Sequence, residues 1–110
     1  MRNHYVYISY EIGGRKYIGS RTCDCLIEDD DYFGSYTDKT FSPTEKLIVA
    51  TFKTRAEANA LETYLHTIYE VDKDPSFANK VVSIDYSGIY ACFYTGEQLK
   101  YTLTYLKYNN

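Results

Sequence analysis

The fold is set by the stretch YVYISYEIGGRKYIG, residues 5–19. Apolar and polar side chains alternate over residues 5–8 and again over 16–19, and this period of two predicts two short β-strands. Gly13-Gly14 lies between them and predicts a tight turn. The stretch therefore predicts an antiparallel hairpin.

Each strand of this hairpin carries a tyrosine on the same face. Ile8 in the first strand and Ile18 in the second face an apolar layer, so Tyr7 and Tyr17 point away from it. Two phenolic hydroxyls then converge on one small region, and Gly19 leaves room there for a backbone or a phosphate to approach. A tyrosine-rich hairpin without a special role is the alternative, because the chain contains 14 tyrosines.

The following segments complete an α+β pattern. Residues 20–42 lack sustained periodicity and predict a long ordered loop with one short helix. The β-branched, nearly continuous apolar run 46–52 predicts a third, central strand. A capping box at Thr54–Glu57 predicts a helix from Arg55 to about Tyr69.

Further elements are expected towards the end of the chain. Residues 81–84 and 89–94 predict short strands, and a second capping box at 95–98 precedes a closing helix. We expect one domain over residues 1–110, with a small, mostly antiparallel central sheet flanked by helices. The core covers about residues 4–80, and a strand and helix extension covers 81–110.

Charge argues against strong, unassisted binding to nucleic acid. The net charge is −3, and phosphate contacts dominate the affinity of nucleic-acid-binding proteins. Glu28 to Asp31 form an acidic run typical of a solvated loop. Arg15, Lys16 and Arg21 lie close in sequence to Tyr17, so we expect a locally basic site on a mildly acidic domain.

Cysteine usage and hydropathy point to the cytosol. Cys23, Cys25 and Cys92 are an odd number, and we expect free thiols. The Cys23-x-Cys25 spacing is tighter than that of the usual zinc knuckle, but a metal- or redox-responsive protein built on this pair is one alternative. No run approaches the ~20 apolar residues of a membrane span, and the first residues contain no apolar signal region.

Together, these features resemble the catalytic domain of the GIY-YIG endonuclease family over about residues 4–80. Tyr5-Val6-Tyr7 stands where the family has Gly-Ile-Tyr, and Tyr17-Ile18-Gly19 matches the Tyr-Ile-Gly element. Glu62 and Asn79 follow in the family's order. The segment after Tyr17 and a later DYFGS, residues 31–35, are similar to small members encoded by bacteriophages, which would act in the host cytoplasm.

The resemblance implies metal-dependent hydrolysis of phosphodiester bonds in DNA. Tyr7 would be the general base, with its pKa lowered by a nearby cation, and Tyr17 would orient water or phosphate. Glu62 would hold a single Mg²⁺ or Mn²⁺. The family's helix arginine is replaced here by Ile27, and Arg21 is the nearest substitute. The literal Gly-Ile-Tyr at 88–90 comes too late in the chain to be the first motif.

Four further residues are expected beside the substrate. Asn79 would brace Glu62 or the loop around it, and Arg15 and Lys16 would contact phosphate. His66, one turn after Glu62, would face the same cleft or the surface. We expect Tyr7, Tyr17, Arg21 and Glu62 to meet on one face of the sheet. The main alternative is a binding module for nucleic acid or protein that has lost cleavage. A second copy, a protein partner or the shape of the substrate would select the DNA site.

Overall fold

The computed structural model describes residues 2–83 of the chain. Its elements are β1 (Asn3–Tyr10), β2 (Lys16–Cys23), the single-turn helix η1 (Ile27–Asp29), β3 (Glu45–Phe52) and α1 (Arg55–Ile68). Residues 81–83 are not in a strand, contrary to the prediction for 81–84. The predicted strand 89–94 and closing helix lie outside the described residues.

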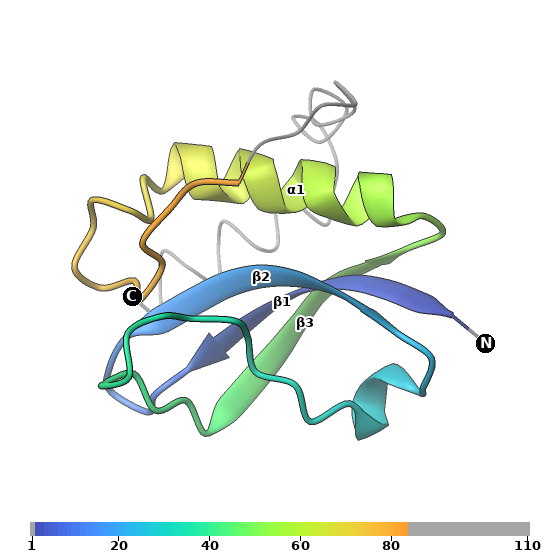
Figure 1. Ribbon diagram of the computed structural model, residues 1–110, viewed down its shortest axis with the longest axis horizontal. Helices are drawn as coiled ribbons and strands as arrows, with labels where there is room; N and C mark the ends of the chain where they lie inside the picture. Colours follow the sequence, from blue (N-terminus) through green and yellow to red (C-terminus); the bar gives the residue numbers. More distant parts are fainter. Residues whose placement is uncertain (1, 84–110) are drawn as a thin grey trace.

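The three strands form one antiparallel sheet in the order β2-β1-β3 (Figure 1). The predicted hairpin is confirmed, and its register places Tyr7 opposite Gly19 and Ser9 opposite Tyr17. Among the three strands within residues 2–83, β1 and not β3 lies in the middle, so this described sheet does not show the central position predicted for the third strand. The apolar run of β3 reflects contacts on both of its faces: Val49 and Ala50 join one hydrophobic cluster and Ile48 packs against the other.

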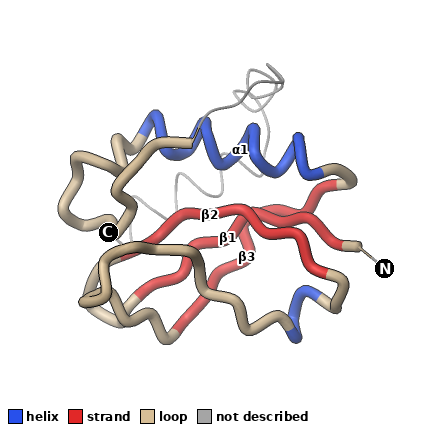
Figure 2. The backbone as a smooth tube through the Cα atoms, in the orientation of Figure 1, coloured by secondary structure: helices blue, strands red, loops and turns tan. Residues whose placement is uncertain are grey.

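Helix α1 covers one face of this sheet (Figure 2). Its side chains Leu61 and Leu65 pack with Ile8 and Ile18 in the main hydrophobic cluster, as the alternation predicted. The helix begins after Thr54, whose hydroxyl accepts the Glu57 backbone N–H at 3.2 Å. That hydroxyl also donates to the Glu57 carboxylate at 3.0 Å, so the carboxylate binds the side chain of the cap and not its backbone N–H.

The loop between β2 and β3, residues 24–44, covers the opposite face, where it passes over the strands (Figure 1). Tyr5 and Tyr7 lie under it, almost fully buried. The predicted long loop with one short helix is confirmed, except that residues 20–23 belong to β2. Both faces of a small sheet are therefore covered, one by a helix and the other by a loop.

The described residues form an α+β arrangement, as the sequence predicted. None of the helices in the described part of the chain has the length and apolar character needed to cross a bilayer.

Candidate functional site

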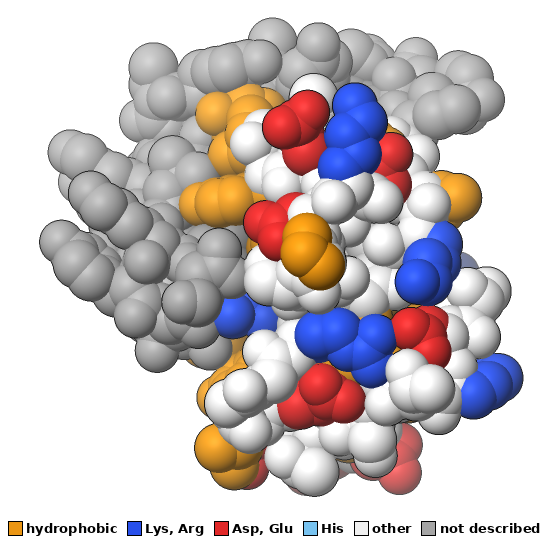
Figure 3. Space-filling view, turned by 90° about the vertical axis from the view of Figure 1, so that its left-hand side faces the viewer, with side chains coloured by type: hydrophobic (Ala, Val, Ile, Leu, Met, Phe, Trp, Pro, Cys, Tyr) orange, Lys and Arg blue, Asp and Glu red, His pale blue; other side chains and the backbone are white. Residues whose placement is uncertain are grey.

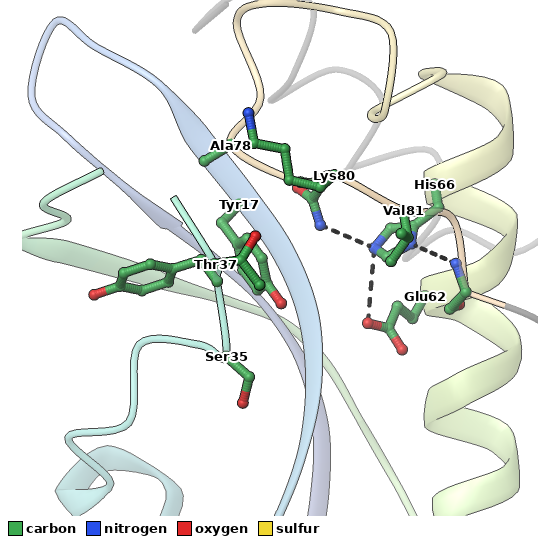
Figure 4. A pocket seen from close by; sticks show the side chains of 11 residues that line it. Tyr17, Ser35, Thr37, Glu62, His66, Ala78, Lys80 and Val81 are labelled. Carbon is green, nitrogen blue, oxygen red and sulfur yellow. Dashed lines mark hydrogen bonds and ion pairs between the residues drawn. The ribbon is translucent and has the colours of Figure 1, made fainter. Parts of the chain in front are cut away.

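A pocket of about 280 Å³ opens beside the edge of β2 that faces away from β1. Tyr17 approaches it from β2, whereas Glu62 and His66 approach it from α1 (Figure 4). The remaining walls come from residues 35–37 of the long loop and from the segment after the helix, 78–83. Four parts of the chain that are distant in sequence thus meet at one strand edge.

Glu62 offers a carboxylate to this pocket. Its Oε1 lies 3.0 Å from the Ser20 hydroxyl, and its Oε2 lies 3.7 Å from His66 Nε2. The side chain is 15% exposed, so the carboxylate is partly sheltered but accessible. Ser20 also lies 2.8 Å from Asn59 Oδ1, which places a further oxygen beside the carboxylate.

His66 is buried and not a surface residue. Its Nδ1 accepts the backbone N–H of Ser83 at 3.0 Å, so the proton of the neutral ring is on Nε2. Nε2 can then donate to the carbonyl of Ile18, 2.8 Å away. With both ring nitrogens engaged, His66 holds α1 against β2 and has no free nitrogen to offer a substrate.

Asn79 makes two hydrogen bonds to one residue of β2. Its Oδ1 accepts the Ile18 backbone N–H at 3.1 Å, and its Nδ2 donates to the Ile18 carbonyl at 2.9 Å. The amide thereby takes the place of a neighbouring strand at this point of the edge. Its Nδ2 also lies 3.4 Å from His66 Nε2, which is 3.7 Å from the Glu62 carboxylate, so the bracing of Glu62 or the loop around it by Asn79 stays a prediction.

Two glycines, Gly19 and Gly34, leave room for the rings of Tyr7 and Tyr17. A Cβ on Gly19 would lie 2.5 Å from the Tyr7 hydroxyl, so the absence of a side chain lets the Tyr7 ring cross β2. A Cβ on Gly34, whose φ is +129°, would lie 2.8 Å from the Tyr17 ring and 3.1 Å from the Tyr7 hydroxyl. The space at Gly19 is filled by Tyr7 and is not available to a phosphate.

The ring centroids of Tyr7 and Tyr17 are 6.4 Å apart. Burial, the neighbouring phenol of Tyr17 and, to a smaller extent, Tyr32 and Glu62 raise the pKa of Tyr7 well above its usual range. Burial and Glu62 raise the pKa of Tyr17 to about 12. Both phenols are therefore protonated at neutral pH in the free protein, and the charge of Glu62 acts on both.

The expected meeting of all four residues on one face of the sheet is wrong. Tyr7 and Tyr17 lie on the loop side, and α1 brings Glu62 from the other side. The two sides meet at the β2 edge, where Gly19 has no side chain and Ser20 reaches the carboxylate. The helix could not share the tyrosine face, because the long loop already covers it.

The expected basic cluster around Tyr17 does not form. Arg15 pairs with Asp38 at 2.7 Å, and Lys16 points to the helix side, where it is 4% exposed and burial lowers its pKa. Lys80 reaches the pocket, but its Nζ lies 3.6 Å from Asp38. One end of the molecule accordingly shows cationic and acidic side chains interspersed (Figure 3).

Arg21 lies on the tyrosine side but is bound to Asp30. Its Nε is 3.1 Å from Asp30 Oδ2, and its guanidinium lies 4.3 Å from the centre of the Tyr32 ring. Its side chain is 34% exposed, so one side of the guanidinium group can contact a ligand. Arg21 does not line the pocket.

Sequence reasoning missed Tyr32 and Ser35. The Tyr32 ring meets Tyr7 edge-on at 6.2 Å, and its hydroxyl is hydrogen-bonded to Ser35. Ser35 lines the pocket beside Tyr17. The signal for these two residues is the DYFGS segment itself. A tyrosine followed closely by glycine and serine in a long loop allows the loop backbone to approach the sheet closely.

Cys23 and Cys25 are paired as a disulfide, with Cα atoms 5.3 Å apart. The prediction of free thiols is wrong for this pair. The chain leaves β2 at Cys23 and turns at once, and this turn brings the second sulfur back to the first. Cys92 lies outside the described residues.

Comparisons of the chain with models of known protein families, with curated proteins and with solved structures find no match.

Proposed function

We propose that this protein is a metal-dependent endonuclease of the GIY-YIG type, which hydrolyses phosphodiester bonds in DNA. The observation that carries the proposal is the juxtaposition of Tyr17 and Glu62 across one pocket, with Tyr7 packed against Tyr17 behind it. These are the residues that the resemblance selected, and they come from opposite sides of the sheet.

The oxygen-rich surroundings of Glu62 fit a hard divalent cation. The Ser20 hydroxyl and the Asn59 amide oxygen lie beside its carboxylate, and no soft ligand lines the pocket within the described residues. Glu62 would hold Mg²⁺ or Mn²⁺, which supplies positive charge to a phosphate during hydrolysis. A single protein carboxylate binds such an ion weakly, so we expect the ion to arrive together with the DNA.

The chain's own residues would orient the reacting groups. The protonated Tyr17 hydroxyl can donate a hydrogen bond to a phosphate oxygen in the pocket. Tyr7 would take a proton from the attacking water, and this requires positive charge close to its hydroxyl when substrate is bound. In the free protein the Nζ of Lys46 lies 5.8 Å from the centre of the Tyr7 ring.

Arg21 is proposed as the phosphate-binding cation. Its contact with Asp30 fixes the guanidinium group, and its planar fork suits a phosphate that approaches along the β2 edge. Because Arg21 does not line the pocket, it would contact a neighbouring phosphate of the DNA backbone. Arg21→Lys should then weaken binding and cleavage together, whereas a large loss of cleavage with normal binding would indicate a direct role at the reacting phosphate.

The proposal is tested by incubating the protein with supercoiled plasmid, branched DNA and single-stranded DNA, each with Mg²⁺ or Mn²⁺. We expect nicking that Glu62→Gln abolishes, since the substitution removes the charge but keeps the shape. The matched control is Glu45→Gln, an exposed position on β3. Equal cleavage by Glu62→Gln and wild type would show that the assigned metal ligand is wrong.

One observation favours a second function, that of a binding module without cleavage. Arg15 and Arg21 are each paired with a carboxylate, and Lys16 is buried on the other side of the sheet. Such a module would bind DNA or a protein through the tyrosine side. Wild-type protein that binds DNA but leaves all three substrates intact with both metals would favour this function.

A further inference from the structure

We propose that Cys23, Cys25 and Asp30 form a second metal site, specific for a soft divalent cation such as zinc, when the two cysteines are reduced. This site lies at the end of β2 and on the turn through η1, away from Glu62. It does not depend on the proposed nuclease activity.

The three potential ligands are already assembled. One sulfur from each cysteine and one carboxylate oxygen of Asp30 all lie within 4.8 Å of one another. Cys23 and Asp30 are buried, at 4% and 9% exposure, and Cys25 is half-buried. Reduction of the disulfide lets the two sulfurs separate to the spacing of ligands on a tetrahedral zinc ion, with Asp30 as the third ligand and the fourth position left to water.

Asp30 retains capacity to accept a metal. Its Oδ2 takes the close contacts, from the Tyr5 hydroxyl at 2.5 Å and Arg21 Nε at 3.1 Å. Oδ1 has only long contacts, 3.4 Å to the Tyr32 backbone N–H and 3.5 Å to Arg21 Nη2. A carboxylate offers about four acceptor positions, so one on Oδ1 can bind an ion.

The charges around the site balance with a divalent ion. Two thiolates and the Asp30 carboxylate carry three negative charges, and Arg21 beside them carries one positive charge. An ion of charge +2 neutralises the remainder, which matters because Cys23 and Asp30 are sheltered from water. Thiolate ligands select soft ions such as Zn²⁺ and Cd²⁺ over Mg²⁺.

The disulfide in the structure is the alternative state of the same two sulfurs. It closes a loop of only three residues, so the chain entropy that stabilises a disulfide is small here. A dithiol reductant breaks the S–S bond and is itself oxidised to a disulfide, leaving two thiols in the protein. Each thiol releases one proton when it binds the ion.

The site is tested with full-length reduced protein and Cd²⁺, whose bond to thiolate gives an ultraviolet charge-transfer absorption, and by competition with Zn²⁺. We expect one equivalent bound by wild type, no binding by Cys23→Ser or Cys25→Ser, and affinity lowered by about tenfold or more in Asp30→Asn. Cys92→Ser and Asp29→Asn serve as matched controls and should bind like wild type.

Three results would overturn the site: no Cd²⁺ binding by reduced wild type, loss of binding in Cys92→Ser, or unchanged affinity in Asp30→Asn. Circular dichroism of each metal-free variant establishes that the fold is retained. If either cysteine variant fails to fold, alkylation of the reduced wild type with iodoacetamide replaces it, and protection of both cysteines by Zn²⁺ is expected. Equal alkylation with and without Zn²⁺ counts against the site. None of these measurements uses cleavage, so their outcome is separate from that of the nuclease proposal.

Discussion

The two faces of the sheet are covered in different ways. On the helix side, aliphatic side chains such as Ile8, Leu61 and Leu65 pack without hydrogen bonds. On the loop side, strand side chains bind the loop: Ser9 donates to the Phe33 carbonyl at 2.7 Å, and Lys46 Nζ donates to the Asp30 carbonyl at 2.6 Å. A covering loop has backbone groups without strand partners, and these polar side chains satisfy them.

This difference predicts which substitutions change the stability of the domain and which also change the candidate site. Packing of the aliphatic side chains is non-directional and depends on buried area, so it stabilises the domain, while Glu62 and His66 of the same helix reach the pocket at its margin. The loop side depends on hydrogen bonds of fixed geometry, and Lys46 binds the Tyr32 carbonyl beside the contacts of Tyr32 and Gly34 with Tyr7 and Tyr17. We therefore expect substitutions of the aliphatic side chains on the helix side to act mainly on stability, and those on the loop side to act on the site as well.

The largest effect is expected for Leu65→Ala on the helix side. Leu65 is fully buried, and its truncation leaves a cavity that should cost about 2–5 kcal/mol in the free energy of unfolding. Urea denaturation measures this cost, with Ile68→Ala, 39% exposed on the same helix, as the matched control. A smaller loss at Leu65 than at Ile68 would contradict the assignment of the main core.

Next in size is Asp30→Asn on the loop side. The substitution weakens charged hydrogen bonds to Tyr5 and Arg21, and we expect a loss of about 3 kcal/mol. Burial alone would raise the pKa of Asp30, but the hydrogen bonds from Tyr5 and Arg21 outweigh burial and lower it. The stabilisation by the Asp30 carboxylate is fully present above the pKa of Asp30 in the unfolded chain, near 3.8. It is lost as the pH falls through the lower pKa that Asp30 has in the folded protein.

Urea denaturation at a series of pH values measures this contribution of Asp30. The difference between wild type and Asp30→Asn should be constant near neutral pH and shrink below about pH 4. Asp29→Asn, on the exposed side of η1, should behave like wild type throughout. A difference that grows on acidification would mean that the pKa of Asp30 is raised by folding.

A third, intermediate effect concerns the contact between Tyr7 and Gly19. Gly19→Ala places a methyl group against the Tyr7 hydroxyl, and overpacking of this kind costs about 2 kcal/mol. Because the ring of Tyr7 must move, the loss in kcat/KM, expressed as a free energy, should exceed the loss in the free energy of unfolding. A double-mutant cycle with Tyr7→Phe, read by urea denaturation and cleavage, should show coupling between the two positions; strict additivity would contradict the contact.

The smallest effect, counted per pH unit, is expected in the pH dependence of cleavage. The pKa of Tyr7 is raised, so the fraction of phenolate increases about tenfold per pH unit, or about 1.4 kcal/mol, across the neutral range. If Tyr7 is the base, kcat/KM should rise about tenfold for each pH unit between about pH 7 and 9. Tyr17→Phe should keep the slope and Tyr7→Phe should lose it. A flat wild-type profile would assign hydrogen-bond donation to Tyr7 instead.

Local patterns in the sequence predicted the elements well. The alternation around Tyr7 and Tyr17 gave the correct faces, and the Thr54–Glu57 box gave the correct start of α1. Each of these signals depends on residues a few positions apart. The order of the strands could not be predicted from such local signals. The packing on the two faces of β3 comes from a helix and a loop that are distant from each other in sequence.

Of the predicted site residues, Tyr17, Glu62, His66 and Asn79 line one pocket, whereas Tyr7, Arg15, Lys16 and Arg21 do not. Glu62 and Tyr17 do share a pocket, but the meeting at a strand edge follows from which face the long loop occupies, and no period in the sequence encodes that choice. The partners of Arg15 and Arg21 were missed for a related reason. Asp38 and Asp30 lie on the loop, and their positions depend on its packing.

Asn79 has a consequence for the behaviour of the protein at high concentration. An open strand edge is a template on which a second chain can pair and begin to aggregate. At Ile18 the Asn79 amide occupies both backbone groups of β2, and the backbone of residues 76–78 does the same at Lys16. The segment that walls the pocket thus also blocks intermolecular strand pairing along this half of β2, so this protection persists only while the segment stays docked.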